Sequence, residues 1–137
     1  MEILSPFQIA FSLLVTLEPE LMGIISLSLG VSLAAVVLSL LIGLPFGAVL
    51  AAYSFPGRGA IIVVTNTLLG MPPVVVGLVI YLLVSRAGPF GFLGILYTPA
   101  AMMLAQTILV LPIAIALSRQ VFETLNTEYA PLFRSIG

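Results

Sequence analysis

Three long runs without a charged side chain divide the sequence, and each is rich in aliphatic residues. The first lies between Glu20 and Arg58 and contains 37 residues; the next two, which end at Arg86 and Arg119, contain 27 and 32. About 20 apolar residues are enough to cross a bilayer, and a charge at the centre of a span costs at least ~2.5 kcal/mol. The pattern therefore predicts three membrane-spanning helices. They are expected at about residues 21–44, 60–84 and 98–118.

The N-terminal segment, residues 3–17, is apolar but short for a span. Its polar residues recur every three or four positions, which places them on one face of a helix. These residues are Ser5, Gln8, Ser12 and Thr16. An amphipathic helix lying in the membrane interface fits this pattern better than a fourth span, which stays open as the alternative. The sequence thus divides into an interfacial helix and turn over 1–20 and a membrane domain over 21–137.

The few basic residues predict the orientation of the chain in the cell membrane. If the C-terminal tail 119–137 is cytoplasmic, three spans place Arg58, Arg119 and Arg134 inside. Only Arg86 then lies outside, in agreement with the excess of basic residues in cytoplasmic loops. We expect a multi-pass protein of the inner or plasma membrane with its N-terminus outside. The opposite topology is disfavoured by this pattern but stays open.

Composition excludes several other classes of protein. Hydrophobic residues make up 61% and charged residues 7% of the 137 residues, and the mean hydropathy is +1.32. A soluble domain carries about 25% charged residues, so a soluble domain is excluded. The sequence has no His, Cys, Lys or Asp, which removes Ser–His and Cys–His catalysis, thiolate and imidazole metal sites and the P-loop. We expect no enzyme activity, no metal site, no cofactor and, with four basic residues, no nucleic-acid partner.

Small and polar residues recur at helical spacing within each predicted span. In the first span they include Gly43 and Gly47, which form a GxxxG pattern. Such stripes either let helix backbones pack closely or line a translocation path, and packing is the more common role. The other members are Ser28, Ser32, Ala35 and Ser39 in the first span; Asn66, Gly70, Pro73 and Gly77 in the second; and Ala101, Ala105, Pro112 and Ala116 in the third.

Two consecutive prolines, Pro72 and Pro73, lie in the middle of the second predicted span. They remove two backbone donors, and backbone groups freed at membrane depth are tolerated only where protein or a water-filled cavity satisfies them. Discontinuous helices of this kind handle ions in transporters. The neutral polar residues of the second and third spans either line the same path or bridge helices by hydrogen bonds. The candidate path residues are Thr65, Asn66, Pro72, Pro73, Gln106 and Thr107.

The stretch Leu69–Gly77 (LGMPPVVVG), followed by Arg86–Gly91 (RAGPFG), resembles the permease subunits of bacterial ABC importers for oxyanions. It is most similar to the tungstate branch, with the molybdate and sulfate permeases as relatives. Residues 106–112 (QTILVLP) fit the same pattern. The resemblance implies an all-α, polytopic permease fold of the binding-protein-dependent type. It also implies several partners: a second permease copy, a cytoplasmic ATP-binding subunit that hydrolyses ATP, an extracytoplasmic substrate-binding protein and membrane lipid.

In that family a cytoplasmic loop carries a signature that ends in Gly and forms the coupling helix docked on the ATPase. Residues 134–137 (RSIG) resemble the end of this signature, so the segment 119–137 is expected to start the coupling loop. Residues 131–133 (PLF) stand where the family has Glu-Ala-Ala, which is a departure from the pattern. The resemblance implies that the full family length extends beyond this segment, so the chain is expected to be truncated. The residues implied in ATPase coupling are Glu128, Pro131, Arg134, Ser135 and Gly137.

These patterns together predict a permease subunit that moves an oxyanion, tungstate or the similar molybdate, into the cytoplasm by alternating access. The alternative is a small membrane-anchor or assembly subunit, or a non-functional permease fragment, with no transport of its own. A fragment of a secondary transporter is a third hypothesis, weakened because no acidic residue lies within a predicted span.

Overall fold

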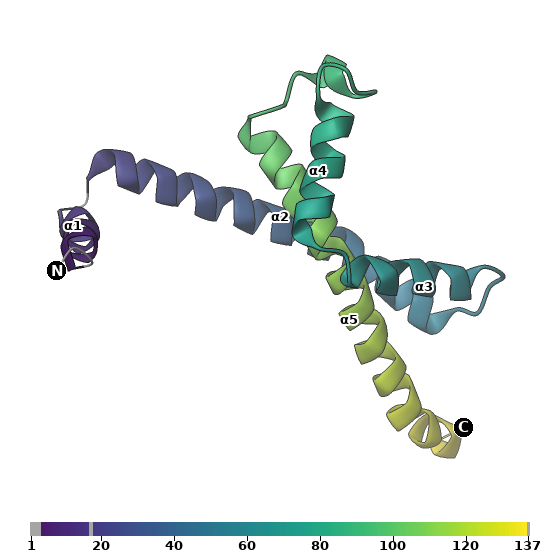
Figure 1. Cartoon of the computed structure of the whole chain (residues 1–137). Coiled ribbons are helices and arrows are strands. Elements are labelled where there is room, and N and C mark those ends of the chain that lie inside the picture. The colour runs from purple at the N-terminus through teal and green to yellow at the C-terminus, as the bar shows by residue number, and fades with distance from the viewer. Residues whose placement is uncertain (1–3, 17, 137) are drawn as a thin grey trace.

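The computed structural model describes residues 4–16 and 18–136, and this part of the chain is helical and contains no strand (Figure 1). By length and apolar composition, α2 and α5 are able to cross a membrane, and α3 together with α4 would form a third, broken span. The predicted all-α, polytopic fold is confirmed. The helices are α1 (Leu4–Val15), α2 (Pro19–Ala52), α3 (Arg58–Leu69), α4 (Pro73–Val84), the short 3-10 helix η1 (Gly91–Leu93) and α5 (Pro99–Ile136).

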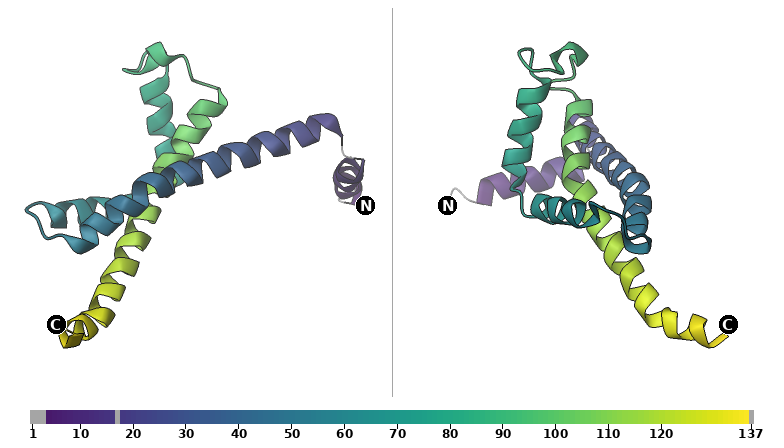
Figure 2. Two further views of the ribbon diagram at one scale, coloured as in Figure 1. Left: turned by 180° about the vertical axis from the view of Figure 1, so that it is seen from behind. Right: turned by 90° about the vertical axis from the view of Figure 1, so that its right-hand side faces the viewer.

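The most extensive packing in the molecule is the crossing of α2 and α5, which Figure 2 shows from two sides. A Cβ atom on Gly43 would lie 2.6 Å from the Cβ of Ala114, and one on Gly47 would lie 2.6 Å from the Cβ of Ser118. Glycine therefore lets the two backbones approach, as small residues do between membrane helices. Two roles were open for the GxxxG pattern, helix packing and lining of a translocation path. In this structure it has the packing role. The buried row on α2 comprises Val31, Ala35, Ser39, Gly43, Gly47 and Leu50.

Two serine hydroxyls connect α2 and α5 across this crossing. Ser39 is fully buried on α2, and its hydroxyl lies 2.8 Å from the Ala35 carbonyl of its own helix and 3.2 Å from the Thr107 carbonyl of α5. Ser118 donates from α5 to the Leu44 carbonyl at 2.9 Å. The Ser118 bond joins a side chain to the backbone of the opposite helix, and the Ser39 hydroxyl lies between acceptors on both helices. Such bonds help polar residues hold helices together where water is absent. Ser28 and Ser32 of the predicted stripe are exposed, because α2 crosses α5 nearer to its C-terminal end.

Helices α3 and α4 meet at a bend of 104°. Residues 70–72 connect them, and Pro73 occupies the start of α4, where the missing N–H of proline would be unpaired in any case. The Pro72 carbonyl accepts a hydrogen bond from the Val75 N–H at 3.0 Å, which begins the first turn of α4. The sequence predicts one span over 60–84 interrupted at these prolines. The structure has that interruption, and both halves pack on α5.

Helix α5 continues without interruption from Pro99 to Ile136. Residues 119–136, which the resemblance assigns to a coupling loop, are therefore helical. Residues 113–130 contain neither Gly nor Pro, and Arg119 forms an ion pair with Glu123 one turn later, which favours helix over this part. Pro112 and Pro131 lie within the same helix. The role of this segment in coupling stays a prediction.

Helix α1 lies apart from the other helices, beyond the N-terminal end of α2 (Figure 1). Its aromatic residues Phe7 and Phe11 are exposed, and α1 has no extensive packing against another helix in the described part of the chain. The helix predicted within residues 3–17 is present, although residues 1–3 and 17 lie outside the described residues. Its position in the membrane interface stays a prediction.

Candidate functional site

The predicted path residues of the second span lie on α3 and at the bend that follows it. Thr65 is buried on α3, and its hydroxyl donates to the Ile61 carbonyl of the same helix at 2.9 Å. Asn66, Pro72 and Pro73 are exposed. Thr65 thus satisfies its own hydroxyl within its helix, whereas the Asn66 amide faces outward and is able to meet a solute or another chain.

The two predicted path residues of the third span are half-buried on α5. The Thr107 hydroxyl donates to the Met103 carbonyl of its own helix at 2.7 Å, and the Thr107 carbonyl accepts the bond from Ser39. Helices α3 and α4 both pack on α5, but within the described residues no hydrogen bond joins Gln106 or Thr107 to the residues at the bend. Thr107 therefore takes part in helix packing.

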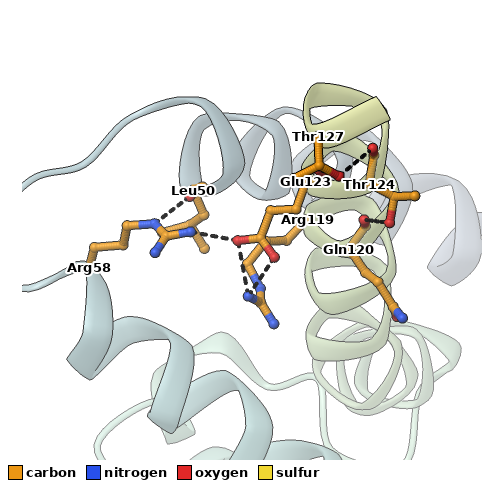
Figure 3. Close-up of polar contacts among 7 residues, drawn as sticks. All are labelled: Leu50, Arg58, Arg119, Gln120, Glu123, Thr124 and Thr127. Carbon is orange, nitrogen blue, oxygen red and sulfur yellow. Dashed lines mark hydrogen bonds and ion pairs between the residues drawn. The ribbon is translucent and has the colours of Figure 1, made fainter. Parts of the chain in front are cut away.

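Charged side chains gather where α2 ends, α3 begins and α5 passes (Figure 3). The Nη2 atom of Arg58 lies 2.6 Å from Oε1 of Glu123, and Nη1 of Arg119 lies 3.1 Å from Oε2 of the same carboxylate. The Nε–H of Arg58 also donates to the Leu50 carbonyl in the last turn of α2 at 2.6 Å. Carbonyls in the last turn of a helix lack a partner within the helix, and a basic side chain satisfies them well. Arg58, Arg119 and Glu123 are called the charge cluster below.

The charge cluster holds three helices together at one end of the molecule. Arg58 is the first residue of α3, so its bonds to Leu50 and Glu123 fix the start of α3 against both α2 and α5. The three side chains are 22–36% exposed, and ion pairs with this access to solvent contribute about 1 kcal/mol or less each. Their effect is to fix geometry, since one carboxylate serves two arginines from different helices.

Arg58 and Arg119 were recognised in the sequence as markers of orientation, whereas Glu123 was missed. The four-residue spacing between Arg119 and Glu123 was the available signal, because residues at that spacing face each other on a helix. No comparable signal existed for the pair of Arg58 with Glu123, which are 65 positions apart in the chain.

The residues implied in ATPase coupling lie in the C-terminal part of α5. Glu128 is exposed. Pro131, Arg134 and Ser135 lie within the last turns of the helix. Gly137 lies outside the described residues. The backbone of this segment is thus helical up to Ile136, and the predicted contacts to an ATPase stay a prediction.

Two cavities in the described part of the chain lie away from the predicted path residues. One, of about 580 Å³, lies between the end of α2 and the C-terminal half of α5, and its lining includes Ala48, Ala52, Phe122 and Tyr129. The other, of about 460 Å³, lies where α4 ends and the following loop leads into α5. Neither is lined by Asn66 or Gln106. A translocation path along the bend would have to be lined on its other side by further side chains.

The structure explains the glycines of the motif Arg86–Gly91, which contributed to the family resemblance. The chain after α4 folds back over the end of that helix, and the Phe90 N–H donates to the Leu83 carbonyl at 2.9 Å. A Cβ atom on Gly88 would collide with the Leu82 and Leu83 carbonyls, and one on Gly91 would collide with the Ser85 carbonyl. Only glycine fits at these two positions, so the motif encodes a loop packed tightly against the end of α4.

Comparison with known proteins gives three similar sequences of the same kind. A "Probable anion ABC transporter permease protein" from Haloferax volcanii is 43% identical over 108 residues, covering 79% of this chain and 47% of that protein. A "Tungstate uptake system permease protein TupB" from Peptoclostridium acidaminophilum is 34% identical over 131 residues, covering 96% of this chain and 58% of that protein. The protein of the same name from Campylobacter jejuni is 40% identical over 83 residues, which is 61% of this chain and 35% of that protein.

No protein-family model matches the chain, and no solved structure matches it. The chain spans about half the length of the curated relatives it matches. The similarity includes the stretches from which the family resemblance was inferred, and the apolar helices are those of a multi-pass membrane protein. The resemblance is confirmed: the chain is a homologue of ABC transporter permease proteins, among them proteins named for tungstate and anion uptake.

Proposed function

We propose that the chain forms part of the permease of an ATP-driven importer that moves a tetrahedral oxyanion, tungstate in particular, into the cytoplasm. The observation that carries this proposal is the 34% identity to a tungstate permease over 96% of the chain. The described helices fit it, because no acidic or basic residue lies in the apolar parts of α2, α3 and α4 where a permanent charge would trap a passing anion. Tungstate and molybdate are similar dianions, and an associated binding protein would select between them.

The proposed path runs past the bend between α3 and α4. A bent helix pair exposes backbone groups and the positive end of a helix in the middle of a membrane, and transporters use such breaks to handle ions. Thr65, Asn66, Pro72 and Pro73 lie at or near this bend, with Gln106 and Thr107 on the helix packed behind it. The exposed Asn66 amide is the strongest candidate among them, since its N–H groups suit an oxyanion and carry no charge.

The C-terminal half of α5 is proposed to face the cytoplasm and to receive the movement of an ATP-binding subunit. The charge cluster would then lie at the cytoplasmic end, and the segment with Glu128, Pro131, Arg134, Ser135 and Gly137 would contact the ATPase. ATP hydrolysis would reside in that separate subunit. An extracytoplasmic binding protein, a second permease copy and membrane lipid complete the proposed assembly, in which α1 lies in the membrane interface.

Uptake measurements test this proposal. The permease is assembled with its ATP-binding subunit and binding protein in proteoliposomes, and ATP-dependent accumulation of tungstate is measured. We expect Asn66→Leu to lower the uptake rate at least about tenfold, because burial of an anion against an apolar surface without a hydrogen bond is costly. Thr67→Val is the matched control on the same helix, since Thr67 is exposed and bonded to the Val63 carbonyl of its own helix.

The outcomes separate the two function classes. Absence of ATP-dependent uptake by the wild-type assembly, with the subunits bound to one another, would support the alternative of an anchor or assembly subunit. Uptake by the wild type with an unchanged rate for Asn66→Leu would keep the transport function and remove Asn66 from the path.

A further inference from the structure

The cavity at the end of α4 is the only one of the two cavities described above that has an arginine in its lining. It has a volume of about 460 Å³ and is formed by the last turn of α4 and the loop that folds over it. Its polar lining consists of Tyr81, Ser85, Arg86 and Tyr97. Pro99, which begins α5 beside this loop, precedes Glu123 of the charge cluster by 24 positions, or about 36 Å of helix. The cavity and the charge cluster therefore lie at opposite ends of the α5 segment that connects them.

Arg86 is exposed at this cavity and has no partner among the described residues. The ion pairs of the described part involve Arg58 and Arg119, and no side-chain hydrogen bond uses Arg86. An arginine after a helix commonly binds the carbonyls of the last turn, but here other groups occupy them. The Ser85 N–H donates to the Tyr81 carbonyl at 2.8 Å, and the Ser85 hydroxyl donates to the Leu82 carbonyl at 3.1 Å.

The loop contributes Tyr97, whose side chain is exposed, to the lining of the cavity. Tyr97 has a φ of 63°. Among the described residues, it is the one non-glycine residue with a backbone in the left-handed region. Residues other than glycine rarely adopt that conformation, and they do so where the surrounding structure imposes it. The neighbouring Tyr81 phenol raises the pKa of Tyr97 above its ordinary value. Within the described part of the chain, no acidic side chain lines the cavity beside Arg86.

We propose that this cavity is a binding site for a hydrated tetrahedral oxyanion, with the Arg86 guanidinium as its cation and the hydroxyls of Tyr81 and Tyr97 as further donors. A guanidinium offers two parallel N–H groups that match two oxygens of an oxyanion. Each phenol carries one O–H group that can donate to an anion oxygen. The volume of about 460 Å³ is larger than that of a single tetrahedral ion, so the ion would be held with part of its water shell.

This inference rests on the proposed function, which supplies the class of anion and the side of the membrane. With the charge cluster at the cytoplasmic end, the Arg86 cavity faces the opposite side, where an anion enters. The site would concentrate the oxyanion before it reaches the bend. A carboxylate on a docked protein offers the same chemistry to Arg86, and the experiment separates the two sources.

Direct binding in the absence of any other subunit tests the site. The chain is placed in lipid nanodiscs, and bound tungstate is measured by equilibrium dialysis, with sulfate as a competing dianion. We expect Arg86→Gln to weaken tungstate binding at least about tenfold and Arg86→Lys to weaken it less, because lysine keeps the charge and loses the paired N–H groups. We expect Tyr97→Phe to weaken it about threefold, through loss of the hydroxyl donor. Phe92→Ala is the control, since Phe92 is exposed in the same loop and does not line the cavity.

Each outcome decides the proposal. Circular dichroism first confirms equal helix content in all variants. Tungstate binding that is absent in the wild type, or equal in the wild type and Arg86→Gln, overturns the site. Equal binding together with weaker docking of the substrate-binding protein to Arg86→Gln assigns Arg86 to a protein carboxylate and also overturns it. Failure of ATP-dependent uptake by the wild-type assembly would remove the proposed function, whereas normal uptake without Arg86-dependent binding would remove only this site.

Discussion

At the scale of single residues, glycine decides how closely α2 and α5 approach. Gly43 and Gly47 stand opposite Ala114 and Ser118, so each helix offers two small residues four positions apart. The close approach also brings the Ser118 hydroxyl within 2.9 Å of the Leu44 carbonyl. Without a hydrophobic effect between helices in lipid, such packing and hydrogen bonding hold the pair together.

Replacement of Gly47 tests this packing. A Cβ atom at Gly47 would lie 2.6 Å from the Ile115 carbonyl oxygen, which is backbone and unable to rotate away. We expect Gly47→Ala to lower the free energy of unfolding by about 1–3 kcal/mol, as overpacking in a tight interface does. The measurement is thermal unfolding in detergent, followed by circular dichroism.

Gly23→Ala is the matched control for Gly47→Ala. Gly23 lies on the same helix, and a Cβ atom added to it would have no neighbour within 4 Å, so alanine meets no obstacle there. Alanine favours a helix over glycine by about 1 kcal/mol, and the control is expected to be neutral or slightly stabilising. Equal destabilisation by both variants would contradict a specific role of Gly47 in the crossing.

At the scale of secondary-structure elements, the molecule depends on α5 as a common support. Helices α2, α3 and α4 each pack on α5, and the bend at Pro72 and Pro73 lets α3 and α4 follow different directions along it. The charge cluster completes this arrangement, because Arg58 binds the end of α2 and a carboxylate of α5 at the same time. The turn between α2 and α3 is thereby held on α5.

A double-mutant cycle with Arg58→Gln and Glu123→Gln measures this connection. We expect a coupling energy of about 0.5–1 kcal/mol in the free energy of unfolding, limited by the partial exposure of both side chains. The coupling should decrease as salt is raised, because salt screens ion pairs that solvent reaches. Additive effects at low salt would show that the pair does not hold α3 in place.

Glu128→Gln combined with Arg58→Gln is the control cycle. Glu128 is exposed on the same helix as Glu123, and no ion pair joins it to Arg58 in the described part of the chain. The two changes should therefore be additive. Arg58→Gln removes one ion pair and the donor to the Leu50 carbonyl, whereas Glu123→Gln weakens the ion pairs of both arginines.

At the scale of the whole molecule, two loops mark the ends of the broken α3–α4 pair. The loop before α3 leads into the charge cluster, and the loop after α4 forms the Arg86 cavity. If the pair crosses the membrane, these loops lie on opposite sides. If the bend returns the chain to the side from which it entered, both lie on the same side.

Single cysteines in the two loops distinguish these arrangements. The native sequence has no cysteine, so Ser54→Cys and Ala87→Cys each introduce one exposed thiol. We expect a membrane-impermeant reagent to label position 54 only from the cytoplasmic side and position 87 only from outside, as the distribution of Arg predicts. Labelling of both positions from one side would establish a re-entrant pair, and labelling with the sides exchanged would reverse the orientation.

Much of the helical organisation could be predicted from the sequence. Uncharged runs longer than a bilayer span located the apolar helices, and the consecutive prolines located the break, because both signals are local and depend on few residues. The family resemblance rested on Leu69–Gly77 and Arg86–Gly91 and is confirmed by the homologues. The structure also explains the glycines of the second motif, which fit against carbonyls at the end of α4.

The amino-acid sequence alone was therefore sufficient to establish the membrane class, the helices, the break and the family. Tertiary contacts were needed to show that Gly43 and Gly47 face α5, that Glu123 joins Arg58 to Arg119, and that Arg86 lines a cavity with two tyrosines. The difference arises because helix formation and membrane insertion depend on residues close together in the chain. The periodic stripe of small residues marked a packing face without identifying the helix that packs on it. A shared carboxylate and a cavity depend on distant segments whose approach leaves no periodic pattern in the sequence.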